Sequence, residues 1–131
     1  MAGEITQFAV QNDYESAKNA ALEYAEIFQD RFYIEIQNHQ IPEELATHSI
    51  LIRLSEELNI PLVATNDCHY ALEEHWEAHD VLFCLGTNKN RSDTNRIRYE
   101  PRQFYIKTDT GNYRLSSLEG KFPPKIDQIC C

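Results

Sequence analysis

The spacing of apolar residues predicts a helix and then a strand near the start of the chain. Beginning at Asn12 or Asp13, apolar side chains recur every three or four positions as far as 29–30, which is typical of an amphipathic helix. Either Asn12 or Asp13 can cap this helix. The following segment, 31–37, alternates apolar and polar residues and is rich in β-branched and aromatic side chains. It is predicted to be a half-buried strand.

A second helix, a second strand and a third helix are predicted next. Pro42 suits the first turn of a helix that runs to Asn59, because its missing N–H is not needed there. The short apolar run 60–65 is typical of a strand covered on both faces in a parallel sheet. Residues Glu73–Leu85 are predicted to be helical, with Gly86 as the stop. The apolar positions expected to be buried in these two helices are Leu45, Ile50, Leu51, Leu54, Leu58, Trp76, His79, Val81, Leu82 and Leu85.

This alternation predicts an α/β fold with parallel strands joined by short loops. Two or three strands make a thin sheet, so the chain is expected to be part of a larger domain. Part of such a domain exposes sheet edges and apolar faces, which favours self-association.

The pattern changes after residue 87. Residues 88–98 are polar and basic and are predicted to form a surface loop, with Arg98–Glu100 and Gln103–Lys107 pairing as a short hairpin. Residues 109–131 have weak periodicity and are expected to be a poorly ordered tail.

Charge narrows the range of functions. The chain has 131 residues, a formal net charge of −9 and a pI near 4.9. A free-standing nucleic-acid binder needs clustered Lys and Arg for phosphate contacts, so the acidic charge argues against that role and leaves open a domain of a larger enzyme whose nucleic-acid channel lies elsewhere. Within the basic loop, Lys89, Arg91, Arg96 and Arg98 are the candidate nucleic-acid contacts, although solvated loops of this composition are also common.

The sequence contains no recognisable targeting signal or cysteine motif. No apolar run is long enough to span a membrane, and residues 1–7 do not resemble a secretory signal, so a cytoplasmic location is expected. The four cysteines form no CxxC pair. Neither a disulfide framework nor a cysteine zinc site is therefore predicted.

The candidate chemistry lies directly after the two predicted strands. Asp67 and His69 follow the strand 60–65, and His39 follows the strand 31–37. Because the carboxyl ends of neighbouring parallel strands meet at one rim, these side chains are expected to lie close together. A carboxylate and imidazoles in such a place can bind a divalent metal ion.

Other polar residues near this rim have simpler interpretations. Glu35 on the first strand is a further candidate ligand, whereas Cys68 is expected to face away as a small packing residue. His79 is interpreted as a core or capping residue, and His48 and His75 as exposed helix positions. Taken alone, an Asp-x-His after a strand is also common among ordinary polar loop residues.

Four longer stretches of the sequence together resemble a known protein family. RFYIEIQNHQIPEE, IPLVATNDCHY, EAHDVLFCLGTNK and RIRYEPRQFYIKT occur in this order. This succession resembles the C-terminal half of the PHP (polymerase and histidinol phosphatase) domain in bacterial DNA polymerase III alpha subunits, over residues 1–108. The resemblance implies part of a distorted (β/α)7 barrel.

The resemblance also implies a site and partners. His39 matches the histidine of the third family motif, and Asp67 and His69 match the Asp-x-His of the fourth. The full family site holds up to three divalent ions, zinc or manganese. Related proteins are phosphoesterases, and some polymerases are thought to use the domain as a 3′–5′ exonuclease, while others keep it only as structure. The implied partners are the N-terminal half of the domain, the polymerase palm and other replisome subunits.

The chain departs from the family at both ends. The N-terminal His-x-His motif and the palm aspartates are absent, and residues 109–131 do not follow the family pattern. A truncated, frameshifted or split gene product would explain both departures. Three of about nine ligands should bind metal weakly, so independent catalysis is not expected. A partner-docking remnant and a stand-alone phosphatase are the alternatives.

Overall fold

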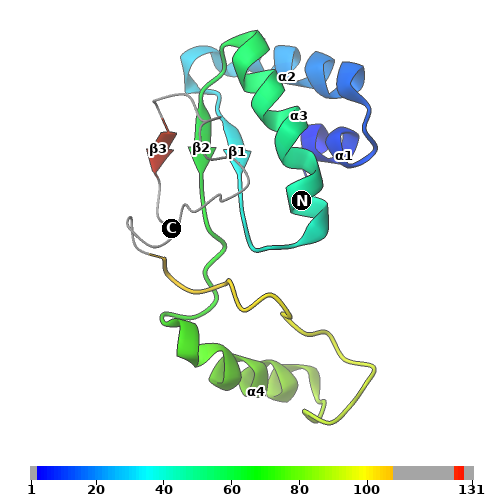
Figure 1. The fold of residues 1–131 in the computed structure, drawn as a ribbon, viewed down its shortest axis with the longest axis vertical. Helices are drawn as coiled ribbons and strands as arrows, with labels where there is room; N and C mark the ends of the chain where they lie inside the picture. Colours follow the sequence, from blue (N-terminus) through cyan, green and yellow to red (C-terminus); the bar gives the residue numbers. More distant parts are fainter. Residues whose placement is uncertain (1–2, 108–125, 129–131) are drawn as a thin grey trace.

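The computed structural model describes residues 3–107 and 126–128. Helices and strands alternate in it, which confirms the predicted α/β class (Figure 1). The helices are α1 (Glu4–Val10), α2 (Tyr14–Phe28), α3 (Pro42–Leu58) and α4 (Trp76–Thr87), and the strands are β1 (Ile34–Ile36), β2 (Leu62–Ala64) and β3 (Ile126–Gln128). Two single 3₁₀ turns, η1 (Gln29–Arg31) and η2 (Glu73–His75), precede β1 and α4.

The three strands form one parallel sheet in the order β1-β2-β3. Ile34 pairs with Leu62 and Ile36 with Ala64, so β1 and β2 end at the same level. All of β2 is buried, and β1 buries its two isoleucines while exposing Glu35, as the patterns predicted. Both strands are shorter than expected. The chain is still turning through η1 before β1, and Pro61 has no N–H to donate to a neighbouring strand.

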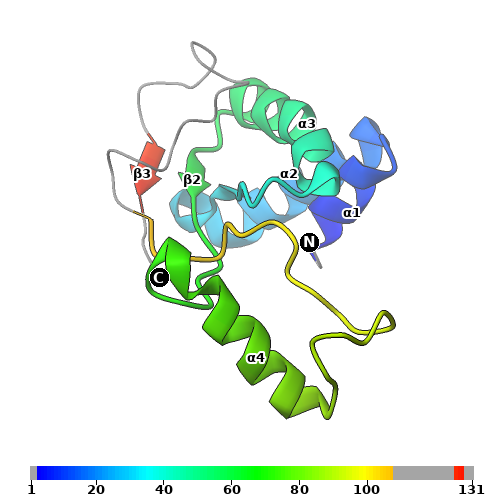
Figure 2. The same cartoon turned by 60° about the horizontal axis from the view of Figure 1, so that its bottom comes forward.

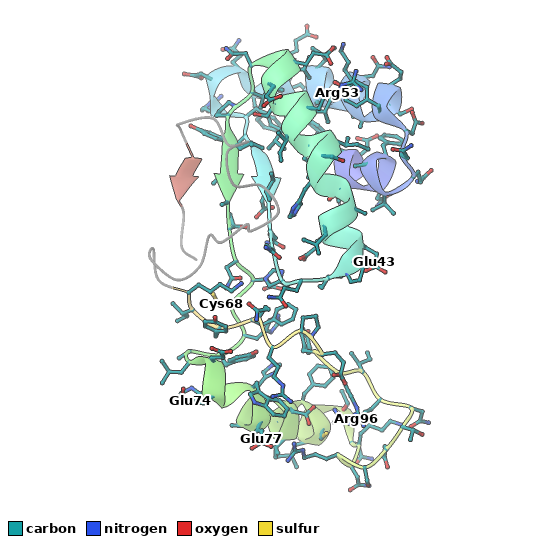
Figure 3. All side chains as sticks on the ribbon, in the orientation of Figure 1. Glu43, Arg53, Cys68, Glu74, Glu77 and Arg96 are labelled. Atoms are coloured by element: carbon teal, nitrogen blue, oxygen red, sulfur yellow. The ribbon has the colours of Figure 1, made fainter. Side chains whose placement is uncertain are left out.

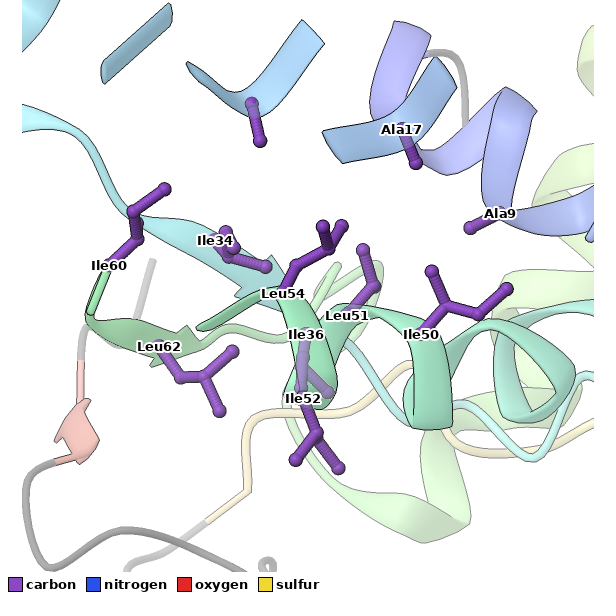
Figure 4. Close-up of a cluster of buried hydrophobic side chains, with 11 residues drawn as sticks. Ala9, Ala17, Ile34, Ile36, Ile50, Leu51, Ile52, Leu54, Ile60 and Leu62 are labelled. Carbon is purple, nitrogen blue, oxygen red and sulfur yellow. The ribbon is translucent and has the colours of Figure 1, made fainter. Parts of the chain in front are cut away.

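The hydrophobic core lies between the first three helices and the sheet. Figure 1 shows these helices gathered on the β1 side, with β3 at the other edge. Figure 4 shows Ile34 and Ile36 of β1 close to Leu51 and Leu54 of α3, and Leu54 is completely buried. Small side chains on α1 and α2, including Ala17, let these helices approach the same cluster. The core thus fixes the level at which β1 and β2 end.

Local capping sets the bounds of α2 and α3. Asp13 caps α2 by accepting the N–H of Ser16 at 3.1 Å, as one of the two predicted caps. Pro42 lies in the first turn of α3, and Asn59 ends that helix in the left-handed conformation. Both predicted helices are therefore confirmed.

Ser55 provides a first test of how α3 is joined to β2. Its buried hydroxyl donates to the Ile60 carbonyl at 2.6 Å. Ser55→Ala is expected to lower the free energy of unfolding by about 1 kcal/mol, because the carbonyl loses its donor. Urea denaturation measures this loss. Ser49→Ala, at an exposed position of the same helix, should be neutral or slightly stabilising, and equal effects of the two substitutions would contradict the assignment.

Two predictions for α3 are wrong. Leu45, expected in the core, is 42% exposed, and His48, expected at the surface, is buried. The helix is turned so that the neighbouring Glu44 and Thr47 also point inward. Each buried polar side chain has a partner: the His48 Nε2 atom lies 2.8 Å from the Gln37 carbonyl, for example. Apolar spacing could not reveal this, because polar residues occupy part of the buried face.

Helix α4 also differs from its prediction. Val81, Leu82 and Leu85 were expected to be buried but are exposed, whereas Cys84 is buried. Gly86 does not stop the helix, which continues to Thr87 and ends at a left-handed Asn88. Figures 1 and 2 show why burial is low: α4 extends away from the sheet and the first three helices. In the described part of the chain, no helix combines the length and apolarity that crossing a membrane requires.

The hairpin predicted from 98–100 and 103–107 is wrong. Instead, Tyr105 forms a parallel bridge with Tyr70, so the returning segment pairs with the loop that follows β2. The tail expected at 109–131 lies outside the described residues, apart from the strand β3, which the sequence did not predict.

Candidate metal centre

The loop after β2 is held by the returning segment 104–107. The Phe104 carbonyl accepts the N–H groups of His69 and Tyr70 at 2.7 and 3.2 Å, and Ile106 donates to the Tyr70 carbonyl. The Asn66 side-chain amide donates to the Tyr105 carbonyl at 2.6 Å. These bonds join segments about 35 residues apart and fix the backbone on which Asp67 and His69 lie. Figure 3 shows this loop, marked by Cys68, between the sheet and α4.

Asp67 and His69 form a close, accessible pair. His69 Nε2 lies 3.1 Å from Asp67 Oδ2, and their side chains are 30% and 58% exposed. Two ligands with metal bonds of about 2.0 to 2.1 Å lie about 3.3 Å apart on a tetrahedral ion. The observed spacing is that of a hydrogen bond between the two side chains, and it is also close to what a shared zinc ion requires.

His39 reaches the same loop from β1 but is fully engaged. Its Nδ1 lies 2.9 Å from Glu44 Oε1, and its Nε2 accepts the Asp67 backbone N–H at 3.1 Å. Because Nε2 acts as an acceptor, the ring proton resides on Nδ1 and is donated to Glu44. The second carboxylate oxygen of Glu44 accepts the His39 backbone N–H at 2.8 Å. The His39 Nε2 lone pair faces the rim, where it holds the backbone of Asp67.

Phe104 connects the two imidazoles. Its ring stacks on His39 with centroids 4.5 Å apart and meets His69 nearly edge-on at 5.4 Å. Phe104 is only 5% exposed. The rim predicted from the strands therefore exists, but an aromatic side chain from a distant segment lies against both histidines.

The other candidates do not join this group. Glu35 bonds to the Thr65 hydroxyl and lies 3.4 Å from the Gln37 amide. The Cys68 thiol lies 3.6 Å from the Tyr105 carbonyl, so it turns toward the returning segment and not toward Asp67. Among the residues that the structure describes, no three His, Cys, Asp or Glu side chains are placed to hold one ion. The described chain therefore supplies two exposed ligands and one engaged histidine, which is less than a complete site.

Comparisons with known proteins show which family the chain is similar to. Residues 1–39 match the PHP domain family, a match that ends at His39. DNA polymerase III subunit alpha from Campylobacter jejuni is 40% identical over 114 residues, covering 87% of this chain and 9% of the relative. The corresponding subunit of Treponema pallidum is 41% identical over 127 residues, covering 96% and 11%. That of Thermus aquaticus is 37% identical over 108 residues, covering 82% and 9%.

The chain is homologous to the PHP region of DNA polymerase III alpha subunits. It spans about a tenth of the length of the curated relatives that it matches. The resemblance drawn from the four ordered strings is thereby confirmed.

Three residues of this PHP region that support the rim were missed in the sequence. From the sequence, Glu44 had no predicted role at the rim, and Phe104 and Lys107 were placed only within the predicted hairpin. Lys107 donates to the Asn38 carbonyl at 3.0 Å, next to His39. Burial lowers the pKa of its ammonium group, and the nearby Glu44 carboxylate opposes that shift. In the sequence, only the five-residue spacing of His39 and Glu44 across the start of a helix could have indicated that the two side chains interact.

Two arginines of the basic loop form ion pairs with carboxylates of α4. Arg96 donates to both carboxylate oxygens of Asp80 at 2.6 and 2.9 Å, and its side chain is 5% exposed. Arg91 contacts Asp80 and Glu77 at 3.2 and 3.3 Å. These two arginines therefore stabilise the junction of α4 and the loop, whatever else they bind.

The Asp80–Arg96 pair predicts a pH dependence of stability. Hydrogen bonds from Arg96 lower the pKa of Asp80 in the folded chain, so the pair is stabilising at neutral pH. That contribution should be lost as the pH falls below the ordinary aspartate range toward the lowered folded pKa. Asp80→Asn should cost about 1 to 2 kcal/mol at neutral pH and flatten this acid dependence. Urea denaturation at several pH values measures both, and an unchanged acid slope would contradict the assignment.

Proposed function

We propose that this chain contributes one part of a divalent-metal site in a DNA polymerase III alpha subunit, where a PHP-type barrel completes it. Asp67 and His69 supply an exposed oxygen and nitrogen at a separation that fits one ion. This spacing is the observation that carries the proposal. The remaining ligands would come from parts of the relatives that this chain does not span. Zinc fits a carboxylate–imidazole pair, and manganese also accepts such ligands.

The residues of the chain would have separate roles in this site. Asp67 and His69 bind the metal, and His39 orders the Asp67 backbone through its Nε2 atom. With the missing ligands in place, His39 Nε2 would exchange the Asp67 N–H for metal and become a third ligand, while Glu44 stays on Nδ1. A bound divalent ion supplies Lewis acidity and a water of lowered pKa, the chemistry of phosphoester hydrolysis and of 3′–5′ exonucleases.

The same proposal implies a cellular location and a set of partners for the chain. The chain would work within a cytoplasmic DNA polymerase, meeting DNA and the other replisome subunits through the rest of that enzyme. Among the described strands β1 lies at an edge of the sheet, and this edge and the exposed leucines of α4 would contact the missing barrel half, the palm or a second copy of the chain.

Metal binding by the full chain tests the proposal. Calorimetric titration with Zn²⁺ or Mn²⁺ should show weak binding that strengthens when the preceding PHP segment is added. Replacing both Asp67 and His69 with alanine should abolish this binding, because both ligand atoms are lost. Glu74→Ala with His75→Ala removes a similar exposed pair on η2 and should leave it intact. Equal metal binding by the two double variants would overturn the proposal.

A structural role is the second candidate, and the engagement of His39 favours it. Both ring nitrogens already bond within the protein, so the rim is held together without an ion. In that case the PHP region would dock the polymerase or a partner without catalysis. The Asp67 and His69 double variant would then bind its partner unchanged, and loss of partner binding would count against this candidate.

A further inference from the structure

Helix α4 has a packed side and an exposed side. On the packed side it meets the loop that follows it: Arg96 binds Asp80, the Phe83 ring lies 5.5 Å from the Tyr99 ring, and Cys84 is buried. Figures 1 and 2 show this loop running back along one side of α4, which extends away from the sheet and the first three helices. The other side of the helix faces solvent.

The exposed side of α4 is an apolar stripe. Val81, Leu82 and Leu85 are 41%, 66% and 72% exposed, and Ala78 is exposed too. Counted from Ala78, these residues lie three, four and seven positions along the helix, which places them all on one face. This spacing is typical of a helix face that packs against another helix. Covering such a stripe removes apolar surface from water and is favourable.

Opposite charges lie beyond the two ends of the stripe. Glu74 comes just before α4, where Figure 3 shows it, and Lys89 comes just after the helix. Both residues are exposed. Lys89 reaches the Asn95 side-chain oxygen at 3.5 Å. In the described part of the chain, neither Lys89 nor Glu74 forms an ion pair. Each charge is therefore available to a partner.

The stripe is complementary to itself when two copies run in opposite directions. In an antiparallel pair centred between Val81 and Leu82, Leu85 lies opposite the partner's Ala78, so a large side chain meets a small one. The same arrangement places Lys89 opposite the partner's Glu74. A parallel pair would instead set equal charges side by side, which is unfavourable.

The exposed apolar residues of α2 lack this complementarity. Leu22 and Ile27 are 46% and 59% exposed. The charges beside them, on Glu23 and Glu26, are both negative, and the last turn of α2 has no basic residue. Two copies joined through this face would bring like charges together. The charges therefore favour α4 over α2 as a contact between copies.

We propose that two copies of this chain associate through the apolar stripe of α4, as an antiparallel pair with twofold symmetry. A contact of this kind uses the same surface on both copies and closes at two. Helix α4 has 12 residues and is about 18 Å long, short for an interface of the usual ~1,200 Å² or more. The pair is therefore in a weak, concentration-dependent equilibrium with the monomer. This inference does not rest on the metal proposal.

Sedimentation equilibrium of the full chain over a range of concentrations tests the pairing. A chelator and a reductant are present, so that neither metal nor a disulfide links the copies. The mass should rise from one copy toward two. Leu82→Glu should weaken association at least about tenfold, because it places a charge in the apolar contact. Ile27→Glu adds the same charge at an exposed position of α2 and should leave association unchanged.

Three outcomes of this experiment would overturn the pairing. The first is a chain that is still monomeric at about 1 mM, the range of the weakest specific contacts; another partner would then cover α4. The second is growth beyond two copies, which a closed twofold contact forbids. The third is an equal effect of Leu82→Glu and Ile27→Glu.

Exchanging the end charges tests the antiparallel direction. Glu74→Lys and Lys89→Glu should each weaken association several-fold, since each variant sets like charges together twice in a pair. An equimolar mixture of the two variants should restore it, because every end contact of a mixed pair again joins opposite charges. Glu26→Lys and Arg31→Glu, at exposed positions near the end of α2, are the matched controls and should neither weaken association nor show rescue. Absence of rescue at α4, or equal rescue by the control pair, would contradict the antiparallel arrangement.

Discussion

Replacing Phe104 with alanine is expected to lower the free energy of unfolding by about 3 kcal/mol, because a buried aromatic ring leaves a cavity at a junction of three segments. The ring stacks on His39 and lies edge-on to His69 and Tyr99. The variant keeps the Phe104 carbonyl that accepts the N–H groups of His69 and Tyr70, but it loses the ring that holds this segment against His39, so the loop after β2 should also become less stable. Urea denaturation followed by Trp76 fluorescence measures the loss.

Two controls make the Phe104 prediction specific. Phe104→Leu keeps most of the volume but removes the stacked ring, and should cost about 1 kcal/mol. Phe28→Ala removes a phenylalanine that is 45% exposed and should cost less than Phe104→Ala. Equal destabilisation by Phe28→Ala and Phe104→Ala would contradict the claim that packing of Phe104 against His39 and His69 stabilises the fold.

Replacing Glu44 with alanine is expected to cost about 2 to 3 kcal/mol. The carboxylate is buried and accepts both the ring N–H and the backbone N–H of His39, so its loss leaves two buried donors unpaired. Burial by itself raises the pKa of Glu44, but the two hydrogen bonds from His39 outweigh it and leave the pKa lowered. The carboxylate is therefore charged at neutral pH, where its removal is measured by denaturation.

Glu44→Gln gives a sharper version of this test. A glutamine side chain offers one acceptor and one donor group, so it can satisfy only one of the two His39 donors. If its amide donates to Nδ1, the ring proton moves to Nε2, which then faces the Asp67 N–H as a second donor. Nitrogen NMR of the His39 ring should show this change of tautomer, or else a weakened backbone bond. Unchanged ring signals with full stability would contradict the assigned hydrogen bonds. Glu43→Gln, at the exposed neighbouring position, is the control.

Sequence patterns predicted the order of the helices and strands well, but they did not predict which helix side chains are buried. Alternation in 31–37 and the apolar run 60–65 each gave a strand, because burial on one or two faces leaves a clear periodicity. The exposed leucines of α4 could not be foreseen, since the same residues would be buried if the missing parts of the relatives packed against them. The burial of Glu44 and His48 could not be foreseen either, since it depends on contacts made in the folded chain.

The sequence predicted which residues lie at the rim of the sheet, but not the contacts that they make there. Equal strand ends brought His39 and the Asp67 loop to one rim, as parallel pairing requires. The hydrogen bond of His39 Nε2 with the Asp67 backbone and the stacking of Phe104 on His39 depend on contacts between residues 28 and 65 positions apart. Local spacing holds no signal for such contacts. The homology to DNA polymerase III alpha subunits followed from longer strings, which carry more information than a two-residue metal motif.

Nitrogen NMR of the histidine rings during zinc titration tests the central claim most directly. If Asp67 and His69 form part of a metal site, the His69 Nε2 signal should shift with added zinc while the exposed His75 does not respond, and Asp67→Ala should remove the shift. A His75 response equal to that of His69, or a His69 response that survives Asp67→Ala, would contradict the account.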